Sequence, residues 1–278
     1  MKYGFVLPRG DAGTAAELAA VAEAAGWDGF FVWEPVWGVD AWVALAAAAM
    51  RTQRVRLGTL LTPLPRRRPW ELAGQVTTLD NLSGGRVTLS VGLGAVHEGW
   101  LAFEPDPGRR VRAELLDEGL EVLTGLLGGQ PYSFAGRHYT VRPTTFVPPP
   151  PPVQRPRVPI WVVGGWPAPR SMRRAARWDG WLPNLITGPG QTGELTPAHL
   201  RDGVEWIRAA RAADGLDMAG FDVIAEGATP ADDPADARAA VAPWRDAGAT
   251  WWIEADWTIP EGDVRAYAER RLAAGPPR

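Results

Sequence analysis

Few side chains that could act as acids or bases lie where we expect catalysis in this sequence. Two of these side chains follow apolar runs. Glu34 ends the run 29–34, and His97 follows the glycine-flanked run 86–94. Either group can hold or move a proton near neutral pH if its surroundings shift its pKa. Both also have a structural interpretation, because Glu34 could pair with a nearby arginine and a single loop histidine is often only solvated. We take Glu34 and His97 as the candidate catalytic residues.

Other kinds of site chemistry are excluded by what the sequence lacks. It has no cysteine, which removes disulfides, thiolate nucleophiles and thiolate metal ligands. Its three histidines, at 97, 138 and 199, lie in three distant segments, so we expect no metal site. The net charge of −3 excludes the basic surface that nucleic acids need. No apolar run of about 18 residues is present, so we expect no membrane contact and a cytoplasmic protein.

Two predicted strand ends carry glycine pairs. A strand end without Cβ atoms lets a flat ligand approach the main chain closely. The second pair also precedes a predicted helix start near 168–169, where free N–H groups and the helix dipole favour a phosphate. A plain tight turn explains that pair equally well. The candidate cofactor-binding residues at these two ends are Gly92, Leu93, Gly94, Gly164, Gly165, Trp166 and the nearby Arg170.

Tryptophan is unusually frequent, with 15 in 278 residues. Trp33, Trp166 and Trp257 fall at predicted strand ends, and Trp181 lies close to one. Any single indole is best interpreted as filling a gap between strands and helices. Four near one rim would instead form an apolar mouth for a planar ring or a hydrophobic substrate. We take Trp33, Trp181 and Trp257 as the candidate substrate pocket.

The elements that position these residues alternate between strand and helix along the chain. Eight such pairs in about 250 residues predict a closed (β/α)8 TIM barrel, an α/β fold whose site lies at the C-terminal ends of its strands. A doubly wound open sheet is the alternative, but the G-x-G-x-x-G run is missing after the first strand. The predicted strands are 2–7, 29–34, 55–61, 86–91, 160–163, 179–183, 221–226 and 250–255, and the predicted helices are 13–25, 41–50, 69–82, 109–127, 168–177, 197–213, 234–246 and 261–273.

One segment, 128–158, interrupts this alternation as an insertion between the fourth and fifth strands. Its part 132–141 could form a hairpin around Ala135 and Gly136. The five prolines at 148–152 favour a stiff, extended spacer over a peptide-docking motif. No domain boundary is visible, so we expect residues 1–278 to form one barrel domain.

Four motifs give the sequence a resemblance to a known family. They are LGTLLTP at 57–63, TLDNLSGGRVTLSVGLG at 78–94, PIWVVGG at 159–165 and RRAARWDGW at 173–181. Together they resemble the bacterial luciferase-like monooxygenases, in order, over most of residues 2–183. From 184 onward the chain fits the expected barrel without a specific motif.

The resemblance implies a (β/α)8 barrel that uses reduced FMN or the deazaflavin coenzyme F420. In that family the ring stacks beside a bulge at the end of the third strand, often with a non-proline cis peptide. By position this bulge falls at Leu60–Leu61, with Thr59 beside it. The glycines at 92–94 and 164–165 match the family's backbone contacts to ring and phosphate.

The end of the second strand departs from the family pattern. Many hydride-transferring deazaflavin members have Asp-His there, whereas this chain has Glu34 and Pro35. The missing histidine weakens the case for substrates such as sugar phosphates or secondary alcohols.

Three hypotheses therefore stay open. The first is a monooxygenase of a small organic molecule that uses reduced flavin and O2. It would be supplied by a separate flavin reductase, because the chain has no NAD(P)H fingerprint. The second is a deazaflavin-dependent hydride-transfer enzyme, and the third a non-catalytic flavin-binding barrel. Such proteins often form homodimers, but the sequence indicates no interface.

Overall fold

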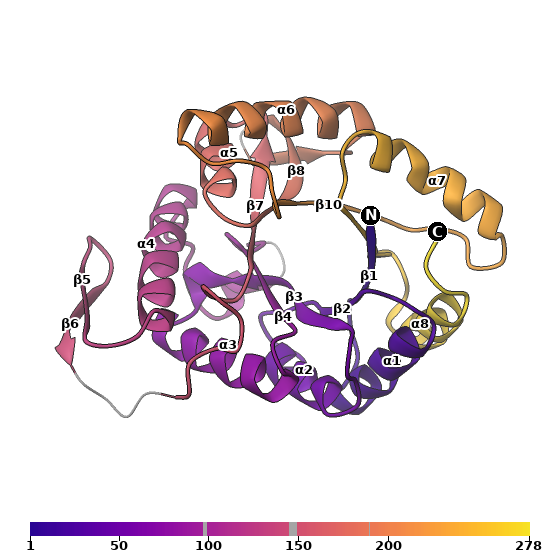
Figure 1. Ribbon diagram of the computed structural model, residues 1–278, viewed down its shortest axis with the longest axis horizontal. Coiled ribbons are helices and arrows are strands. Elements are labelled where there is room, and N and C mark those ends of the chain that lie inside the picture. The colour runs from indigo at the N-terminus through magenta and orange to yellow at the C-terminus, as the bar shows by residue number, and fades with distance from the viewer. Residues whose placement is uncertain (97–98, 145–148, 189) are drawn as a thin grey trace.

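The backbone forms a closed barrel of eight parallel strands, as the alternation predicts (Figure 1). This computed structural model describes residues 1–96, 99–144, 149–188 and 190–278. Pairing of β8 with β10, through Gly180 with Asp222 and Trp181 with Val223, closes the ring. The barrel strands are β1 (Lys2–Leu7), β2 (Gly29–Val32), β3 (Arg56–Pro63), β4 (Val87–Gly92), β7 (Ile160–Trp166), β8 (Gly180–Gly188), β10 (Asp222–Gly227) and β11 (Trp251–Glu254).

Eight helices surround the barrel among the described residues, and Figure 1 shows them as its outer ring. Local sequence signals set several of their ends. Asp40 caps α2 by accepting hydrogen bonds from the backbone N–H groups of Trp42 and Val43. Gly84 ends α3 in the left-handed conformation. The helices are α1 (Ala12–Ala24), α2 (Ala41–Ala49), α3 (Pro69–Ser83), α4 (Arg109–Leu127), α5 (Pro169–Ala176), α6 (Pro197–Ala213), α7 (Pro234–Asp246) and α8 (Val264–Ala273).

Three large aromatic side chains fill the lower half of the barrel, at the N-terminal side of its strands. Phe31, Trp161 and Trp251 are fully buried, and their ring centroids lie 5.2–6.1 Å apart. Glycines make room for them: a Cβ atom on Gly180 would lie 2.4 Å from Trp161, and one on Gly29 would lie 3.0 Å from Trp251. This cluster, the aromatic floor, closes the barrel from below.

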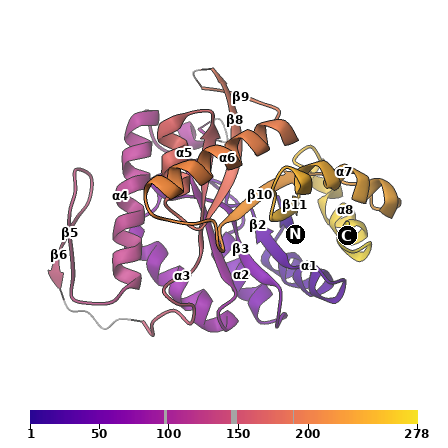
Figure 2. The same ribbon diagram turned by 45° about the horizontal axis from the view of Figure 1, so that its top comes forward.

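The insertion forms the predicted hairpin, from β5 (Tyr132–Ala135) and β6 (Thr140–Thr144). Figures 1 and 2 show it projecting beside α4. The Glu118 carboxylate of α4 holds it there by accepting hydrogen bonds from the backbone N–H groups of residues 137, 138 and 139 at 2.8–3.0 Å. Residue 148, the first of the proline run, lies outside the described residues, so the spacer interpretation of the whole run stays a prediction.

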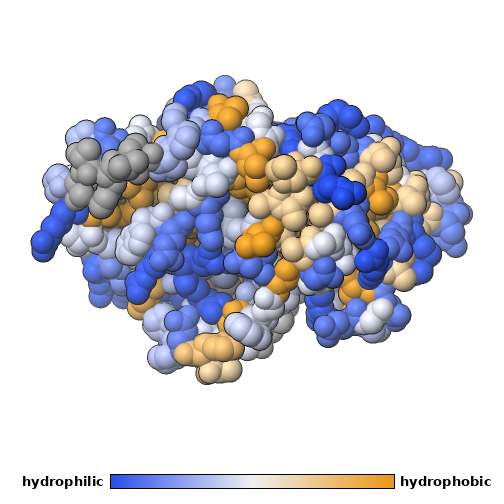
Figure 3. Space-filling model, turned by 90° about the horizontal axis from the view of Figure 1, so that it is seen from below, coloured by the Kyte–Doolittle hydropathy of each residue, from blue (hydrophilic) through white to orange (hydrophobic). Residues whose placement is uncertain are grey.

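A further short strand lies over the C-terminal side of the barrel. It is β9 (Gln191–Gly193), which pairs antiparallel with the end of β8. Three 3-10 turns complete the described elements: Leu64–Arg66, Trp100–Ala102 and Glu261–Asp263. Figure 3 shows one outer face, on which hydrophilic residues predominate and apolar residues gather in small patches. Among the described residues, no helix is long and apolar enough to cross a membrane.

Candidate active site

Two adjoining cavities open above the aromatic floor, at the C-terminal ends of the strands. The first has a volume of about 280 Å³ and the second of about 490 Å³. They share a border formed by Trp33, Leu61 and Ala95, which line both. The position agrees with the rule that barrel sites lie at the C-terminal face.

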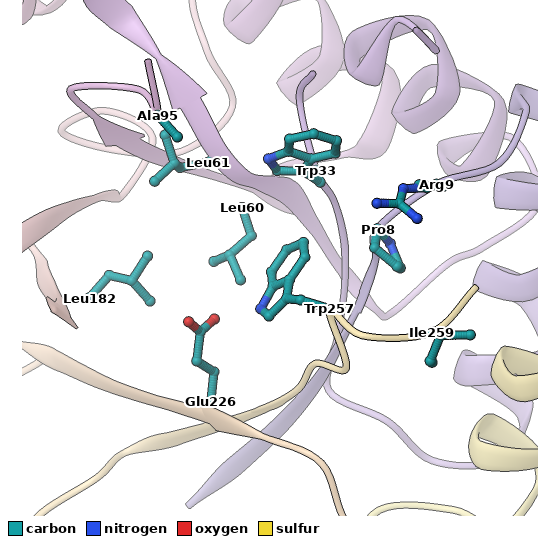
Figure 4. Close-up of a pocket in the computed structure, with 10 residues that line it drawn as sticks. All are labelled: Pro8, Arg9, Trp33, Leu60, Leu61, Ala95, Leu182, Glu226, Trp257 and Ile259. Carbon is teal, nitrogen blue, oxygen red and sulfur yellow. The ribbon is translucent and has the colours of Figure 1, made fainter. Parts of the chain in front are cut away.

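The first cavity is mostly apolar (Figure 4). Trp33 and Trp257 meet in it edge to face, with centroids 6.4 Å apart and ring planes at 73°. Two predicted substrate-pocket residues therefore do line a cavity. Its apolar lining consists mainly of Pro8, Trp33, Leu60, Leu182, Trp257 and Ile259.

The second cavity lies between the ends of β2, β3, β4, β7 and β8. Three of the predicted cofactor-binding residues, Leu93, Gly94 and Gly165, line this cavity. Gly94 has φ of +77°, and a Cβ atom there would lie 2.9 Å from Pro63. Glycine suits position 94 because the backbone there is left-handed and the crowded wall leaves no room for a side chain.

Arginines missed in the sequence analysis also face the second cavity. Arg112 donates to the carbonyl oxygens of Leu93 and Gly94 at 3.3 and 3.0 Å, and its guanidinium lies 3.0 Å from Asp106. These bonds fix the path of the chain after β4. Arg109, at the start of α4, is exposed and lines the same cavity, where its positive charge can meet an anion.

The predicted bulge is present at the end of β3. The pairing register of β3 with β4 shifts between Thr59 and Thr62, and the peptide bond between Leu60 and Leu61 is cis. The bulge turns the Leu60 side chain into the first cavity and places Leu61 between the two. It therefore shapes the border that the cavities share.

Glu34 lies in the wall of the second cavity with both carboxylate oxygens engaged. Arg67 donates to Oε1 at 3.0 Å, while the Thr62 hydroxyl and the Trp42 indole N–H donate to Oε2 at 2.7 and 3.2 Å. Burial raises the pKa of Glu34 above its usual value, and the charge of Arg67 opposes that rise. The arginine partner that the structural interpretation expects is thus in place.

Five predicted cofactor-binding residues line neither cavity, and Thr59, Trp166 and Arg170 are three of them. Thr59 is fully buried, and its hydroxyl lies 2.9 Å from that of Thr62, so it supports the Glu34 network instead. Arg170 is exposed on α5 and does not line either cavity. Trp166 packs against the core between barrel and helices, because the inward and outward positions of a strand alternate.

Trp181 corrects the substrate-pocket prediction. Its indole is fully buried outside the barrel wall, where it donates a hydrogen bond to the Gly164 carbonyl oxygen at 2.9 Å. A Cβ atom on Gly164 would lie 2.6 Å from this ring, and one on Gly203 would lie 2.1 Å from it. Gly164 therefore makes room for an indole, and it lines neither cavity.

Gly92 and Gly165, two further predicted glycines, have different surroundings from Gly164. Gly92 is buried just behind the second cavity, and a Cβ atom there would lie 3.0 Å from Leu61. The Gly165 N–H is already bonded to the Ser171 hydroxyl at 2.9 Å, so it is less free than the sequence suggests. His97 lies outside the described residues, and its role stays a prediction.

Glu226 is the site residue that the sequence analysis missed. It ends the inward-facing row of β10 and projects into the first cavity (Figure 4). The Glu226 side chain is exposed to the open cavity, and desolvation by the apolar walls around it raises its pKa to about 7. A charged residue that follows the apolar run 223–225 at a predicted strand end was the available signal.

The second cavity fits a flavin-type ring. Its volume is within the range of ordinary cofactor pockets, and Leu61, Leu93 and Val163 supply apolar wall for a flat ring. Exposed arginine and backbone at its outer edge suit a phosphate-bearing tail. Fold and cavities together define a (β/α)8 barrel that is built to hold a large planar ligand.

Comparison with known proteins agrees with this class. The model of the luciferase-like monooxygenase family matches residues 4–275, so the chain belongs to that family. An uncharacterized protein of Mycobacterium tuberculosis is 30% identical over 302 residues, which cover 98% of each chain. The F420-dependent glucose-6-phosphate dehydrogenase of Nakamurella multipartita is 34% identical over 214 residues, covering 73% of this chain and 60% of that protein.

Solved structures extend the likeness to the whole fold. The crystal structure of monooxygenase RslO1 from Streptomyces bottropensis superposes with a TM-score of 0.78 and 23% identity. The superposition covers 99% of this chain and 98% of that one. The (β/α)8 architecture is therefore common to both chains over their full described length.

Proposed function

We propose that this chain is a flavin-dependent monooxygenase that acts on a small organic substrate. The observation that carries the proposal is the shared border of the two cavities. A ring in the second cavity and a substrate in the first would touch across Trp33, Leu61 and Ala95. Such contact is what an oxidoreductase must provide, because the cofactor carries the redox chemistry and the protein positions it.

The residues of the chain would contribute binding, orientation and exclusion of water. Reduced flavin, when bound, supplies the electrons for reaction with O2. Trp33 and Trp257 keep the first cavity apolar, which favours a hydrophobic substrate over water. Glu34 holds Thr62 and Arg67 in place beside the bulge and so keeps the ring side of the border rigid.

Deazaflavin-dependent hydride transfer is the second candidate. Its support is the 34% identity to the F420-dependent dehydrogenase of Nakamurella multipartita. Against it stands Glu34–Pro35 at the end of β2, where many such enzymes have Asp-His. Both oxygens of Glu34 are engaged by neighbours, which leaves it poorly placed to replace a histidine as proton acceptor.

Cofactor titration tests the proposal. The purified chain is titrated with FMN, with reduced FMN under anaerobic conditions and with F420, and binding is followed by quenching of tryptophan fluorescence. We expect reduced FMN to bind at least about tenfold more tightly than F420, a difference of about 1.4 kcal/mol. A preference for F420 would establish the second candidate, and binding of none of the three would contradict both.

A variant control links the signal to the second cavity. Gly94→Ala places a side chain against Pro63 and strains a backbone with φ of +77°. We expect it to weaken FMN binding, whereas Gly74→Ala, in open space on α3, should leave binding unchanged. O2 consumption with a separately supplied flavin reductase then shows turnover, and its absence across a substrate panel would favour a non-catalytic flavin-binding barrel.

Two assembly features belong to the same proposal. A separate reductase would supply the reduced flavin, and the chain would form a homodimer in solution. Sedimentation of the purified chain with and without FMN measures the second point directly. A monomer at all concentrations would contradict the dimer without affecting the proposed chemistry.

A further inference from the structure

The Glu226 carboxyl is the least satisfied acidic group inside the barrel. Along β10, Ile224 faces the barrel interior and Ala225 faces the helices, so Glu226 takes the next inward position. Figure 4 shows its carboxylate directed into the first cavity between Leu60, Leu182 and Trp257. In the described part of the chain, no side chain forms a hydrogen bond or ion pair with it.

The other interior carboxylates are satisfied by neighbours. Glu34 has three hydrogen-bond donors, as described above. Glu254 accepts hydrogen bonds from the backbone and hydroxyl of Thr229 and lies 3.4 Å from Arg271. Structural carboxylates in this protein are thus paired, and Glu226 is not. Because Glu226 is exposed in the cavity, its carboxyl is free to bond to a ligand that replaces water there.

The described residues that line the first cavity include one other charged side chain. Arg9 lines the same cavity, but Figure 4 shows it beside Pro8, with Trp257 on the side toward Glu226. Desolvation alone accounts for the raised pKa of Glu226, with no charged neighbour contributing. The carboxyl therefore changes its protonation state near neutral pH, in contact with whatever occupies the cavity.

We propose that Glu226 determines substrate specificity by accepting a hydrogen bond from a hydroxyl or N–H group on a one- or two-ring aromatic compound. This inference rests on the proposed function and names its substrate class. The ring would lie against Trp33 and Trp257, in a cavity whose volume of about 280 Å³ suits one or two fused rings. The carboxylate would replace the water that such a donor loses on entry.

The charge state of Glu226 makes the expected ligand preference depend on pH. Above neutral pH the carboxylate only accepts hydrogen bonds, so it favours a ligand that donates one. Below neutral pH the carboxyl is itself a donor, and the preference for donor ligands decreases. A residue that merely supported the fold would not make ligand preference depend on pH.

Matched ligand pairs test the proposal on the full chain by titration calorimetry. One arm compares 2-naphthol with 2-methoxynaphthalene, and the other compares indole with benzofuran, so that hydroxyl and N–H donors are separated. At about pH 8.5 we expect the donor-bearing member of at least one pair to bind about tenfold more tightly, the effect of one hydrogen bond to a charged group. At about pH 5.5 the preference should fall to about threefold or less.

Variants assign the preference to Glu226. Glu226→Leu should abolish the preference at both pH values, and Glu226→Gln should reduce it and remove its pH dependence. Glu205→Leu, an exposed acid on α6, is the matched control and should change nothing. Equal affinity within both pairs for the wild type, or an unchanged preference in Glu226→Leu, would overturn the proposal.

The test separates this inference from the proposed function, because the ligands are measured without cofactor. FMN binding that fails while the ligand preference persists would count against the proposed function only. FMN binding that persists in all variants, with no preference within either pair, would count against the role of Glu226 only. FMN titration also verifies that each variant is folded around the second cavity.

Discussion

In the lower half of the barrel, Trp161 and Trp251 are fully buried, whereas at the mouth Trp33 and Trp257 face open cavities. The lower indoles lie opposite glycines, which have no side chain to occupy the same space. The upper pair lies opposite leucines, a proline and a carboxyl group that leave space unfilled. Tryptophan thus fills the closed end of the barrel and also lines its open end.

The comparison shows that what faces an indole decides its role. Trp161 also donates a hydrogen bond to Asp222 at 3.1 Å, which links β7 to β10 over the intervening β8. Trp257 is 44% exposed, and the described residues give its indole N–H no comparable partner. Stability should therefore depend on the floor and ligand binding on the mouth.

Truncation of one indole from each end tests this division, and it should give the largest effect. Trp161→Ala removes a fully buried ring and should lower the free energy of unfolding by about 3–5 kcal/mol. Trp257→Ala should lower it by less than about 1 kcal/mol, because the ring is partly exposed. Urea denaturation followed by circular dichroism measures both. Equal losses in the two variants would show that floor and mouth are not distinct.

Glycine substitution should give a smaller effect on the same floor. Gly180→Ala places a Cβ atom 2.4 Å from Trp161 and should cost about 1–3 kcal/mol by overpacking. Gly74→Ala, in the interior of α3 with open space around it, should stabilise the chain by about 0.5–1 kcal/mol. Thermal melts compare the two variants. A Gly180→Ala variant as stable as the wild type would mean that the side chains of the aromatic floor can move to accommodate the added Cβ atom.

Periodicity predicted the fold well because it reports burial. Helices 109–127, 197–213 and 234–246 have the predicted bounds. Strand ends were less well placed: β3 and β8 run on to Pro63 and Gly188, past the predicted 61 and 183. Pairing with neighbouring strands extends these two, and a single sequence contains no information about such partners.

The site was predicted less completely, since a strand position alone does not give the direction of a side chain. Trp181 is the second residue of β8 and faces the helices, whereas Trp33 directly follows the end of β2 and faces the cavities. Gly164 was interpreted as a ligand contact although Trp181 occupies the space beside it. Glu226 was overlooked because its significance lies in the absence of a partner, which only the three-dimensional arrangement reveals.

The smallest expected effect concerns the charge at the mouth. The pKa of Glu226 is about 7 in the folded chain and 4.5 as its ordinary value. Because the folded value is raised, stability that is present below about pH 4.5 is lost as the pH rises through about 7. Glu226→Gln carries no such charge, so it should match the wild type near pH 4.5 and exceed it above pH 7. Water in the cavity screens the carboxylate, so the gain in melting temperature should be only about 1–3 °C.

Thermal melts between about pH 4.5 and 9 measure this difference, with Glu205→Gln as the exposed control that should show none. Trp161→Phe removes the hydrogen bond to Asp222 and leaves Glu226 in place, so it should not reproduce a gain that appears as the pH rises above 7. A gain for Glu226→Gln that is largest at low pH would mean that the carboxylate is stabilised in the folded chain. The contrast between the two ends of the barrel would then rest on exposure alone, because the buried Trp251 indole N–H of the floor also lacks a hydrogen-bond partner.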